Sequence, residues 1–337
     1  MRKRIWAVLL AVCLLMGLLP TTALAGGLTT VKTYEKLVEA LENPTEIIYL
    51  EPAEDFGWPK TGTLSIPANT QIIVVDENEQ KAPWEIPGGI TVNFEQNTHG
   101  ISCSTLTVNG TMHKAYSSQG GLDFDTLVIG PTGVFSCEDD REGYSTVASV
   151  YIAAGKTLKV QEGADMNARV RLDGTLTGEG TVSGQVQVSG GYSSTAANAT
   201  LSGDLTLTGG LAVGSENSDY ADQLTIPAGS HIVAKNLCWT SINNATLNLD
   251  GTLEFKRDST DSGYCAPSIN AGGKIVMDGG RLVLNTPYRL TEGILDWADG
   301  EEVTYAKIQE AIPTPLISGT GTIYFNDSES AAGEENG

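Results

Sequence analysis

The sequence predicts an all-β solenoid, in which one chain winds into stacked coils of short strands. The main signature is a repeated phrase: an apolar-x-apolar strand, a glycine-containing turn and a second short apolar strand. Strand-and-turn units that recur roughly every 20 residues are typical of stacked coils. The 39 glycines suit the tight turns between them. Copies of the phrase begin at residues 106, 127, 150, 170, 205, 224, 247 and 275, with an abbreviated copy at 186.

An antiparallel meander is the competing fold. Asn109-Gly110, Asp173-Gly174 and Asp250-Gly251 lie between short apolar strands, and such dipeptides are strong hairpin signals. We favour the solenoid because the phrase recurs along the whole chain and its copies differ in length at their edges, not in their turn cores. A sandwich of this size would also need longer alternating strands.

The first 25 residues have the features of an export signal. Three basic residues precede the apolar stretch Ile5–Leu19, and Ala23 and Ala25 form a small-x-small cleavage site before Gly26. The apolar stretch is too short for a comfortable membrane span, and no second long one follows. We therefore expect a secreted or cell-surface protein with no membrane span once the signal peptide, residues 1–25, has been removed.

The charge balance of the chain restricts its partners. Removal of the signal takes the net charge from −21 to −24, because it removes three basic residues and no acid. This balance disfavours nucleic acid and anionic membranes, which attract clusters of Lys and Arg. It suits a soluble extracellular protein and also permits divalent-cation sites.

The predicted elements begin with a lead-in and a capping helix over residues 26–44. Thr33 has the features of a helix N-cap, and the residues after it carry apolar side chains at helical spacing as far as Asn43-Pro44. A solenoid leaves its first coil with an open apolar end, and an amphipathic helix here would cover it. The first expected strand is Ile47–Leu50.

Residues 45–326 are expected to form the solenoid itself, with Leu64–Val74 as an early copy of the phrase. An irregular insertion is expected at about 287–315, where Trp297 and an acidic run depart from the pattern. The small and acidic residues 327–337 are expected to form a disordered tail.

The repeated phrase, the capping helix and the export signal together resemble the right-handed, single-stranded parallel β-helix superfamily of bacterial exported proteins. That superfamily includes pectin-lyase-like and pectate-lyase-like enzymes, tailspikes, adhesins and other cell-surface proteins. The resemblance implies a right-handed parallel β-helix over residues 45–326 in an extracellular, bacterial setting. The Thr-Leu-x-Val-x-Gly-Thr pattern is more similar to the sequences of the non-catalytic surface members than to those of the enzymes.

The catalytic motifs of the related enzymes are incomplete in this chain. Where the polygalacturonase type has Asn-Thr-Asp, the sequence reads Asn97-Thr98-His99, and Asp139-Asp140 is not followed by Gly-His-Gly or Arg-Ile-Lys. We therefore assign no catalytic residues and favour a non-enzymatic protein. A polysaccharide lyase or glycoside hydrolase of the pectate-lyase-like fold is the alternative.

One acidic stretch is the best candidate for a metal or ligand loop. Glu138, Asp139, Asp140 and Glu142 surround Arg141, and carboxylate oxygens are the ligands that calcium prefers. We expect a solvated loop in a protein without a cofactor. A calcium site is the alternative, and calcium is the cofactor that this loop would hold.

Three aromatic residues, Trp58, Trp84 and Tyr144, are candidates for stacking against a glycan. Both tryptophans neighbour prolines and lie between expected strands. Large amphipathic rings in such places more often pack partly buried, so we expect burial over the cap or over a groove, with stacking as the alternative.

The four cysteines after the signal permit two disulfides in an exported protein. Cys103 with Cys137, and Cys238 with Cys265, are the pairs that neighbouring coils would bring within reach, since stacked strands lie about 4.8 Å apart. Four buried thiols are the alternative.

These observations together lead us to expect an exported, non-enzymatic β-helix that acts as a surface or secreted interaction module. Glycans and host or cell-envelope surface proteins are the partners that fit, and the sequence sets no oligomeric state. A structural stalk or spacer of a cell-envelope assembly is a further alternative, besides the enzyme.

Overall fold

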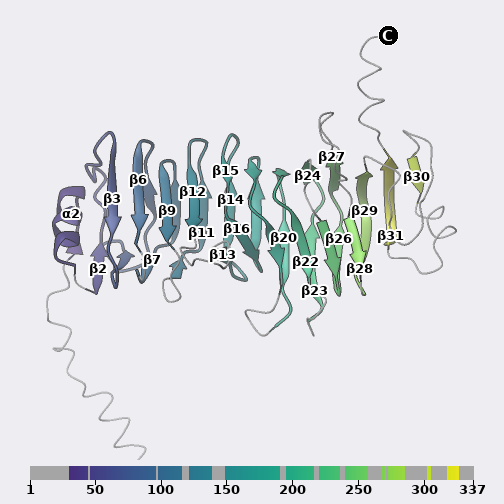
Figure 1. Cartoon of the computed structure of the whole chain (residues 1–337), viewed down its shortest axis with the longest axis horizontal. Helices are drawn as coiled ribbons and strands as arrows, with labels where there is room; N and C mark the ends of the chain where they lie inside the picture. Colours follow the sequence, from purple (N-terminus) through teal and green to yellow (C-terminus); the bar gives the residue numbers. More distant parts are fainter. Residues whose placement is uncertain are drawn as a thin grey trace, which may run out of the picture.

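The computed structural model describes residues 30–44, 46–95, 98–115, 121–138, 149–189, 195–215, 220–235, 240–256, 267–270, 272–284, 302–304 and 317–325. These residues form a right-handed parallel β-helix, whose axis runs horizontally in Figure 1. A typical coil contributes one strand to each of three lateral faces, and the strands of successive coils pair in parallel. The predicted solenoid is confirmed, and the antiparallel meander is not adopted.

The first face consists of two sheets that follow one another along the axis. The sheet nearer the N-terminus contains β1 (Thr30–Val31), β2 (Ile47–Leu50), β4 (Gln71–Val74), β7 (Gly100–Ser102) and β10 (Gly121–Asp123). The other contains β13 (Ser149–Ile152), β16 (Arg169–Leu172), β19 (Val186–Val188), β22 (Leu211–Gly214), β25 (Thr240–Asn243) and β28 (Pro267–Asn270).

The second and third faces run without such an interruption. The second face contains β5 (Trp84–Ile86), β8 (Thr105–Val108), β11 (Thr126–Ile129), β14 (Thr157–Val160), β17 (Thr175–Gly178), β20 (Asn198–Leu201), β23 (Asp222–Ile226) and β26 (Ala245–Leu249). The third face contains β3 (Gly62–Ile66), β6 (Ile90–Phe94), β9 (Thr111–Ala115), β12 (Val134–Glu138), β15 (Asp165–Met166), β18 (Thr181–Val182), β21 (Asp204–Leu207), β24 (His231–Lys235) and β27 (Thr252–Lys256).

The two ends of the stack differ from the coils between them. The long strand β29 (Lys274–Leu284) pairs with both β26 and β27, so it continues the second and third faces together. The strand β31 (Ile317–Phe325) pairs in parallel with β29, whereas β30 (Glu302–Thr304) pairs with β31 in the antiparallel sense. β30 lies within the insertion expected at 287–315. The tail 327–337 lies outside the described residues.

The helix α2 (Tyr34–Glu42) lies at the opposite end of the stack from β31 (Figure 1). Thr33 is its N-cap in an extended conformation, and the Thr33 hydroxyl accepts a hydrogen bond from the Lys36 N–H at 3.4 Å. Leu37 is fully buried and joins the core of the first coils. The predicted capping helix is therefore confirmed, with its N-cap at the expected residue.

The core is a set of apolar columns inside the coils, built by strands whose side chains alternate between interior and surface. On the second face, Leu106, Leu127, Leu158, Leu176 and Leu201 stack in register and are each fully buried. Because every coil buries its side chains against the coils on both sides, stability is shared between neighbouring units.

The three Asn-Gly and Asp-Gly dipeptides lie at corners of the coils instead of in hairpins. At each corner, one carbonyl of the preceding coil accepts two successive backbone N–H groups: Ile86 O from residues 109 and 110, Ile152 O from 173 and 174, and Ile226 O from 250 and 251. A Cβ on any of these glycines would lie closer than 3.0 Å to backbone oxygens of that coil. Glycine is needed here for close approach between coils and not for a hairpin turn.

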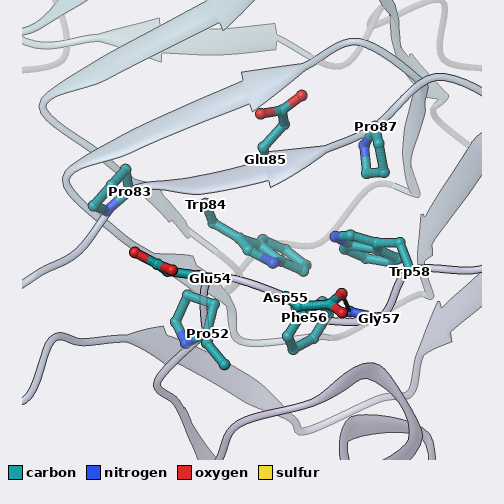
Figure 2. A pocket seen from close by; sticks show the side chains of 11 residues that line it. Pro52, Glu54, Asp55, Phe56, Gly57, Trp58, Pro83, Trp84, Glu85 and Pro87 are labelled. Atoms are coloured by element: carbon teal, nitrogen blue, oxygen red, sulfur yellow. Dashed lines mark hydrogen bonds between the residues drawn. The ribbon is translucent and has the colours of Figure 1, made fainter.

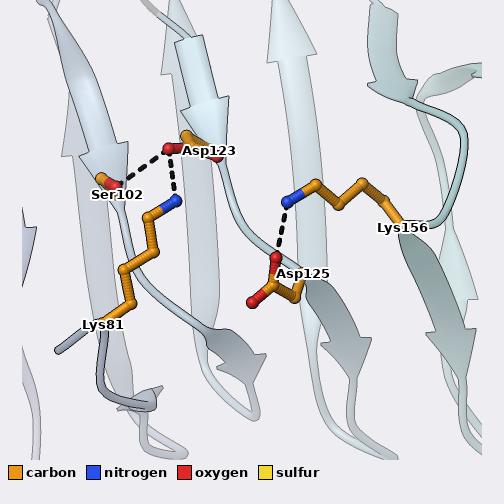
Figure 3. Close-up of polar contacts among 5 residues, drawn as sticks. All are labelled: Lys81, Ser102, Asp123, Asp125 and Lys156. Carbon is orange, nitrogen blue, oxygen red and sulfur yellow. Dashed lines mark hydrogen bonds and ion pairs between the residues drawn. The ribbon is translucent and has the colours of Figure 1, made fainter.

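A row of polar side chains crosses several coils at the corner between the first and second faces (Figure 3). Lys81 Nζ forms an ion pair with Asp123, whose carboxylate also accepts a hydrogen bond from the Ser102 hydroxyl at 3.0 Å. Lys156 forms a second ion pair with Asp125. This second pair joins the coils of β11 and β14, beside the place where the first face is interrupted between β10 and β13.

We expect the Asp123→Asn variant to show how this row contributes to stability as a function of pH. The hydrogen bond from Lys81 lowers the pKa of the Asp123 carboxyl below its usual value. A carboxyl whose pKa is lower in the folded state stabilises the fold above its unfolded pKa, about 3.9. That contribution disappears as the pH falls through the folded pKa.

The variant should therefore be less stable than the wild type at pH 7 and equal to it near pH 2. Because Asp123 is about half exposed, the expected difference is below about 1 kcal/mol. Urea denaturation at both pH values measures it. The double variant Lys81→Met/Asp123→Asn should lose no more free energy of unfolding than the two single variants lose in sum. A difference that persists unchanged at low pH would contradict the ion-pair explanation.

Candidate binding pocket

The candidate site forms because the second face begins one coil later than the other two. Residues 51–61 connect β2 of the first face to β3 of the third face without forming a strand. The first strand of the second face is β5, which pairs with β8 on one side. The loop 52–58 lies on the other side of β5, and a pocket opens between them (Figure 2).

The pocket has a volume of about 450 Å³, which is within the range of small-ligand sites. Aromatic rings, prolines and acids dominate its surface, and no basic residue contributes to it. The lining residues are Pro52, Ala53, Glu54, Asp55, Phe56, Gly57, Trp58, Pro83, Trp84, Glu85 and Pro87.

Four aromatic rings are packed together at the pocket and the adjoining cap. Trp58 stacks on Trp84 with the ring centroids 5.9 Å apart and an interplanar angle of 28°. Phe56 meets Trp58 edge to face at 5.1 Å, and Tyr34 of α2 lies 5.2 Å from Trp58. Trp84 is buried and Trp58 is half-buried, so Trp58 is the more accessible ring of the stacked pair. The cluster fixes that ring in place.

The loop is fastened to the cap and to itself by backbone hydrogen bonds. The Tyr34 N–H donates to the Phe56 carbonyl at 2.7 Å, which joins the first turn of α2 to the loop. Asp55 Oδ1 accepts from the Gly57 N–H at 3.1 Å in a local turn, and Gly57 has a φ of 76° that suits glycine. The capping helix therefore also holds one wall of the pocket.

The polar groups of the pocket comprise one donor and three carboxylates. The indole N–H of Trp84 is buried and has no hydrogen-bond partner among the described residues. Figure 2 shows the nitrogen on the edge of the ring nearest Asp55 and Phe56. Glu54, Asp55 and Glu85 are exposed, and Glu85 Oε1 accepts a hydrogen bond from the Asn109 amide at 2.8 Å. An aromatic platform with acceptors around it can bind a ligand that has a flat apolar face and several donors.

The structure brings together two of the three predicted stacking residues, Trp58 and Trp84. Tyr144 lies outside the described residues. Asp139, Asp140 and Glu142 also lie outside them, and Glu138 is placed only as the last backbone position of β12. The metal or ligand loop therefore stays a prediction. Within the described ranges, the structure contains no cluster of three or more His, Cys, Asp or Glu that could hold a metal ion.

The cysteines do not follow the predicted stacking where the structure describes them. Cys103 is a free, buried thiol, and burial raises its pKa to about 12. Cys137 lies on the third face, where Lys114 is in register with it, whereas Cys103 lies at the corner after β7. The two cysteines therefore do not stack on one another. Cys103 thus matches the buried-thiol alternative. Cys238 and Cys265 lie outside the described residues, and so do the signal residues Ala23, Ala25 and Gly26.

Sequence reasoning missed Glu54, Asp55 and Phe56 as parts of the site, as well as the role of Tyr34. The signal that could have found them is the stretch from Pro52 to Pro59, which lacks the apolar alternation of the neighbouring strands. Such a stretch marks the coil in which one strand is replaced by a loop.

Comparisons with other proteins give no assignment: no family model matches the chain, and neither the curated proteins nor the solved structures contain a match. In the parts of the chain that the structure describes, no helix combines the length and apolar character needed to cross a bilayer. The pocket and the sequence pattern are the features that bear on function.

Proposed function

We propose that the chain is an exported, non-enzymatic β-helix that acts as a surface or secreted interaction module and binds glycans in the Trp58–Trp84 pocket. Export rests on the signal sequence of residues 1–25. The observation that carries the binding proposal is the ring of Trp58, held half-buried at a concave site by Trp84, Phe56 and Tyr34.

The chemistry of a sugar matches what the pocket offers. A pyranose ring has an apolar face of C–H groups that stacks on an indole, and it carries hydroxyls on its edge. Carboxylates such as Glu54 and Asp55 accept hydrogen bonds from hydroxyl groups, with more strength than neutral acceptors do. Because the aromatic cluster is already packed, little side-chain freedom is lost when a ligand binds.

The alternative function, a polysaccharide lyase or glycoside hydrolase of the pectate-lyase-like superfamily, rests on the acidic stretch 138–142 and on the resemblance of the sequence pattern. The stalk or spacer alternative rests on the elongated shape alone (Figure 1). The binding module is supported by the aromatic loop that replaces a strand in the first coil and lines a pocket beside β5.

The first test is binding of the mature chain, residues 26–337, to a panel of polysaccharides and oligosaccharides. We expect Trp58→Ala to weaken binding at least about tenfold, because it removes the stacking surface. Tyr151→Ala is the matched control, since Tyr151 is an exposed aromatic residue on β13, away from the pocket. Isothermal titration calorimetry measures the affinities, and thermal unfolding checks that both variants are folded.

The outcomes separate the three functions. Glycan binding that Trp58→Ala weakens and Tyr151→Ala leaves intact supports the proposal. Release of reducing or unsaturated sugar products, abolished by Asp139→Ala or Asp140→Ala, would establish the enzyme instead. Absence of binding and of cleavage across the panel would leave the spacer function and overturn the glycan proposal.

A further inference from the structure

The first face is interrupted between two coils that are otherwise neighbours. β10 is the last strand of one of its sheets and β13 is the first strand of the other, and no backbone pairing joins these two strands. The second and third faces continue at this step, because β11 pairs with β14 and β12 pairs with β15. Every other step of the first face from β1 to β28 is paired. The junction between the coil of β10–β12 and the coil of β13–β15 therefore lacks one of its three ladders.

The interior side chains mark the same place. Ile48, Ile72 and Ile101 stack in one column of the first face and are each fully buried. Leu122 of β10 continues this column, but it is only half-buried. Its neighbour in the ladder on one side is Ile101, and the ladder ends on the other side. The core is thus incompletely covered at the first face of the junction.

The third face is also short at this junction. All five residues of β12 pair with β9 in the preceding coil, whereas only Val134 and Phe135 pair with β15 in the following coil. β15 itself contains only two residues, Asp165 and Met166. The last three residues of β12 therefore have ladder partners on one side only.

The second face joins the two groups of coils most firmly. All four residues of β11 pair with β14, and a backbone hydrogen bond closes each end of this ladder. The Thr157 N–H donates to Asp125 O at 2.8 Å, and the Gln161 N–H donates to Ile129 O at 2.9 Å. The ion pair between Lys156 and Asp125 lies at the first of these ends, next to the interrupted face (Figure 3).

A junction that is held along one face and open along another has the geometry of a hinge. The stability of a solenoid is approximately a sum over units and over the interfaces between neighbours, so cooperativity is lowest where a coil makes the fewest interactions with the next. We infer that the β-helix contains two cooperative units, residues 30–138 and 149–325, which separate at the first face while the β11–β14 ladder acts as the hinge. The pocket belongs to the first unit, since its lining residues lie between Pro52 and Pro87. Unfolding of the second unit therefore leaves the pocket formed.

Hydrogen exchange of the mature chain tests for two units, because exchange reports the free energy of local opening for each segment. The measurement uses mass spectrometry in urea below the main unfolding transition. Phe94→Ala in β6 and Phe255→Ala in β27 each remove a fully buried ring, one from each unit. We expect Phe94→Ala to accelerate exchange at least about tenfold in β2–β12 and less than about twofold in β16–β29. Phe255→Ala should have the reverse effect.

A second pair of variants tests the hinge. Lys156→Met removes the ion pair beside the interrupted face and should accelerate exchange in β10 and β13 about threefold, since a partly exposed ion pair contributes modestly to stability. Lys32→Met is the matched control, because it removes a partly exposed ion pair with Glu51 in the first coils. It should leave exchange in β10 and β13 unchanged.

The position of the boundary decides the inference. Acceleration of equal size on both sides of the junction, by either phenylalanine variant, would show a single cooperative unit and overturn it. A boundary between β18 and β19 would also overturn it, because the ladders there are short but all three faces are paired. Two units combined with no response of β10 and β13 to Lys156→Met would retain the units and overturn the hinge.

Discussion

Replacement of Gly174 by alanine is expected to lower the free energy of unfolding by about 3 kcal/mol. The new Cβ would lie closer than 3.0 Å to the backbone oxygens of Ala153 and Lys156 in the preceding coil. Relief of that overlap would separate the coils and break the hydrogen bonds from residues 173 and 174 to Ile152 O. Urea denaturation followed by circular dichroism measures the loss on the mature chain.

The control for this prediction is Gly155→Ala, in the facing turn. Gly155 has a φ of 78° and no atom within 4 Å of an added Cβ, so the change introduces backbone strain alone. It should cost about 1 kcal/mol. If Gly174→Ala were no more destabilising than Gly155→Ala, close approach between coils would not be the reason for glycine at the corner.

The second large effect is expected at Phe255, one of the largest fully buried side chains. Its partner in the ladder is Ala234 on β24, and a large side chain over a small one fills the interior. Phe255→Ala would leave two small residues side by side and a cavity, at a cost of about 4 kcal/mol. Thermal and urea denaturation measure the loss.

Two further variants, a rescue and a control, test whether lost interior packing causes this destabilisation. Ala234→Leu in the Phe255→Ala background should recover part of the lost stability, because it returns volume to the same layer. Glu254→Ala, the neighbouring outward position, removes the contact to His231 Nε2 at 2.8 Å and should cost less than about 1 kcal/mol. Equal losses in Phe255→Ala and Glu254→Ala would show that the interior of this coil is not packed as described.

Local features of the fold were predictable because they depend on nearby residues. The capping helix follows from the N-cap at Thr33 and apolar side chains at helical spacing, and α2 begins and ends where that pattern predicts. The strands follow from the alternation of apolar and polar residues. The winding of these strands into three-faced coils is the step that the sequence indicates less directly.

The repeated phrase marks corners of the coil, but different copies mark different corners. The copy at 106 joins β8 to β9, between the second and third faces, whereas the copy at 150 joins β13 to β14, between the first and second. Leu127 consequently stacks on Leu158 and not on Val150. The corners share the same strand–turn–strand pattern. The number of residues between two successive copies is therefore not the number of residues in a coil.

The site was predictable only in part, for a related reason. Trp58 and Trp84 stand out as large rings beside prolines, and the structure shows their burial: Trp84 is buried and Trp58 is half-buried on top of it. Stacking against a glycan stays a prediction. The acids Glu54 and Asp55 read as ordinary surface residues. They become part of a pocket only because the second face starts one coil late. No pattern within residues 51–61 indicates the position of the next coil.

The corners from the third face to the first have a consequence for how such a protein can diverge. Residues 95–99 make this connection between β6 and β7, while residues 167–168 suffice between β15 and β16. The strands on either side keep their place in the ladders in both cases. Insertions and deletions at this edge therefore leave the stack intact, because lengthening a loop increases the entropic cost of closing it only slightly. Selection can vary the length and sequence of the loops along this edge while the residues that hold the coils together remain unchanged.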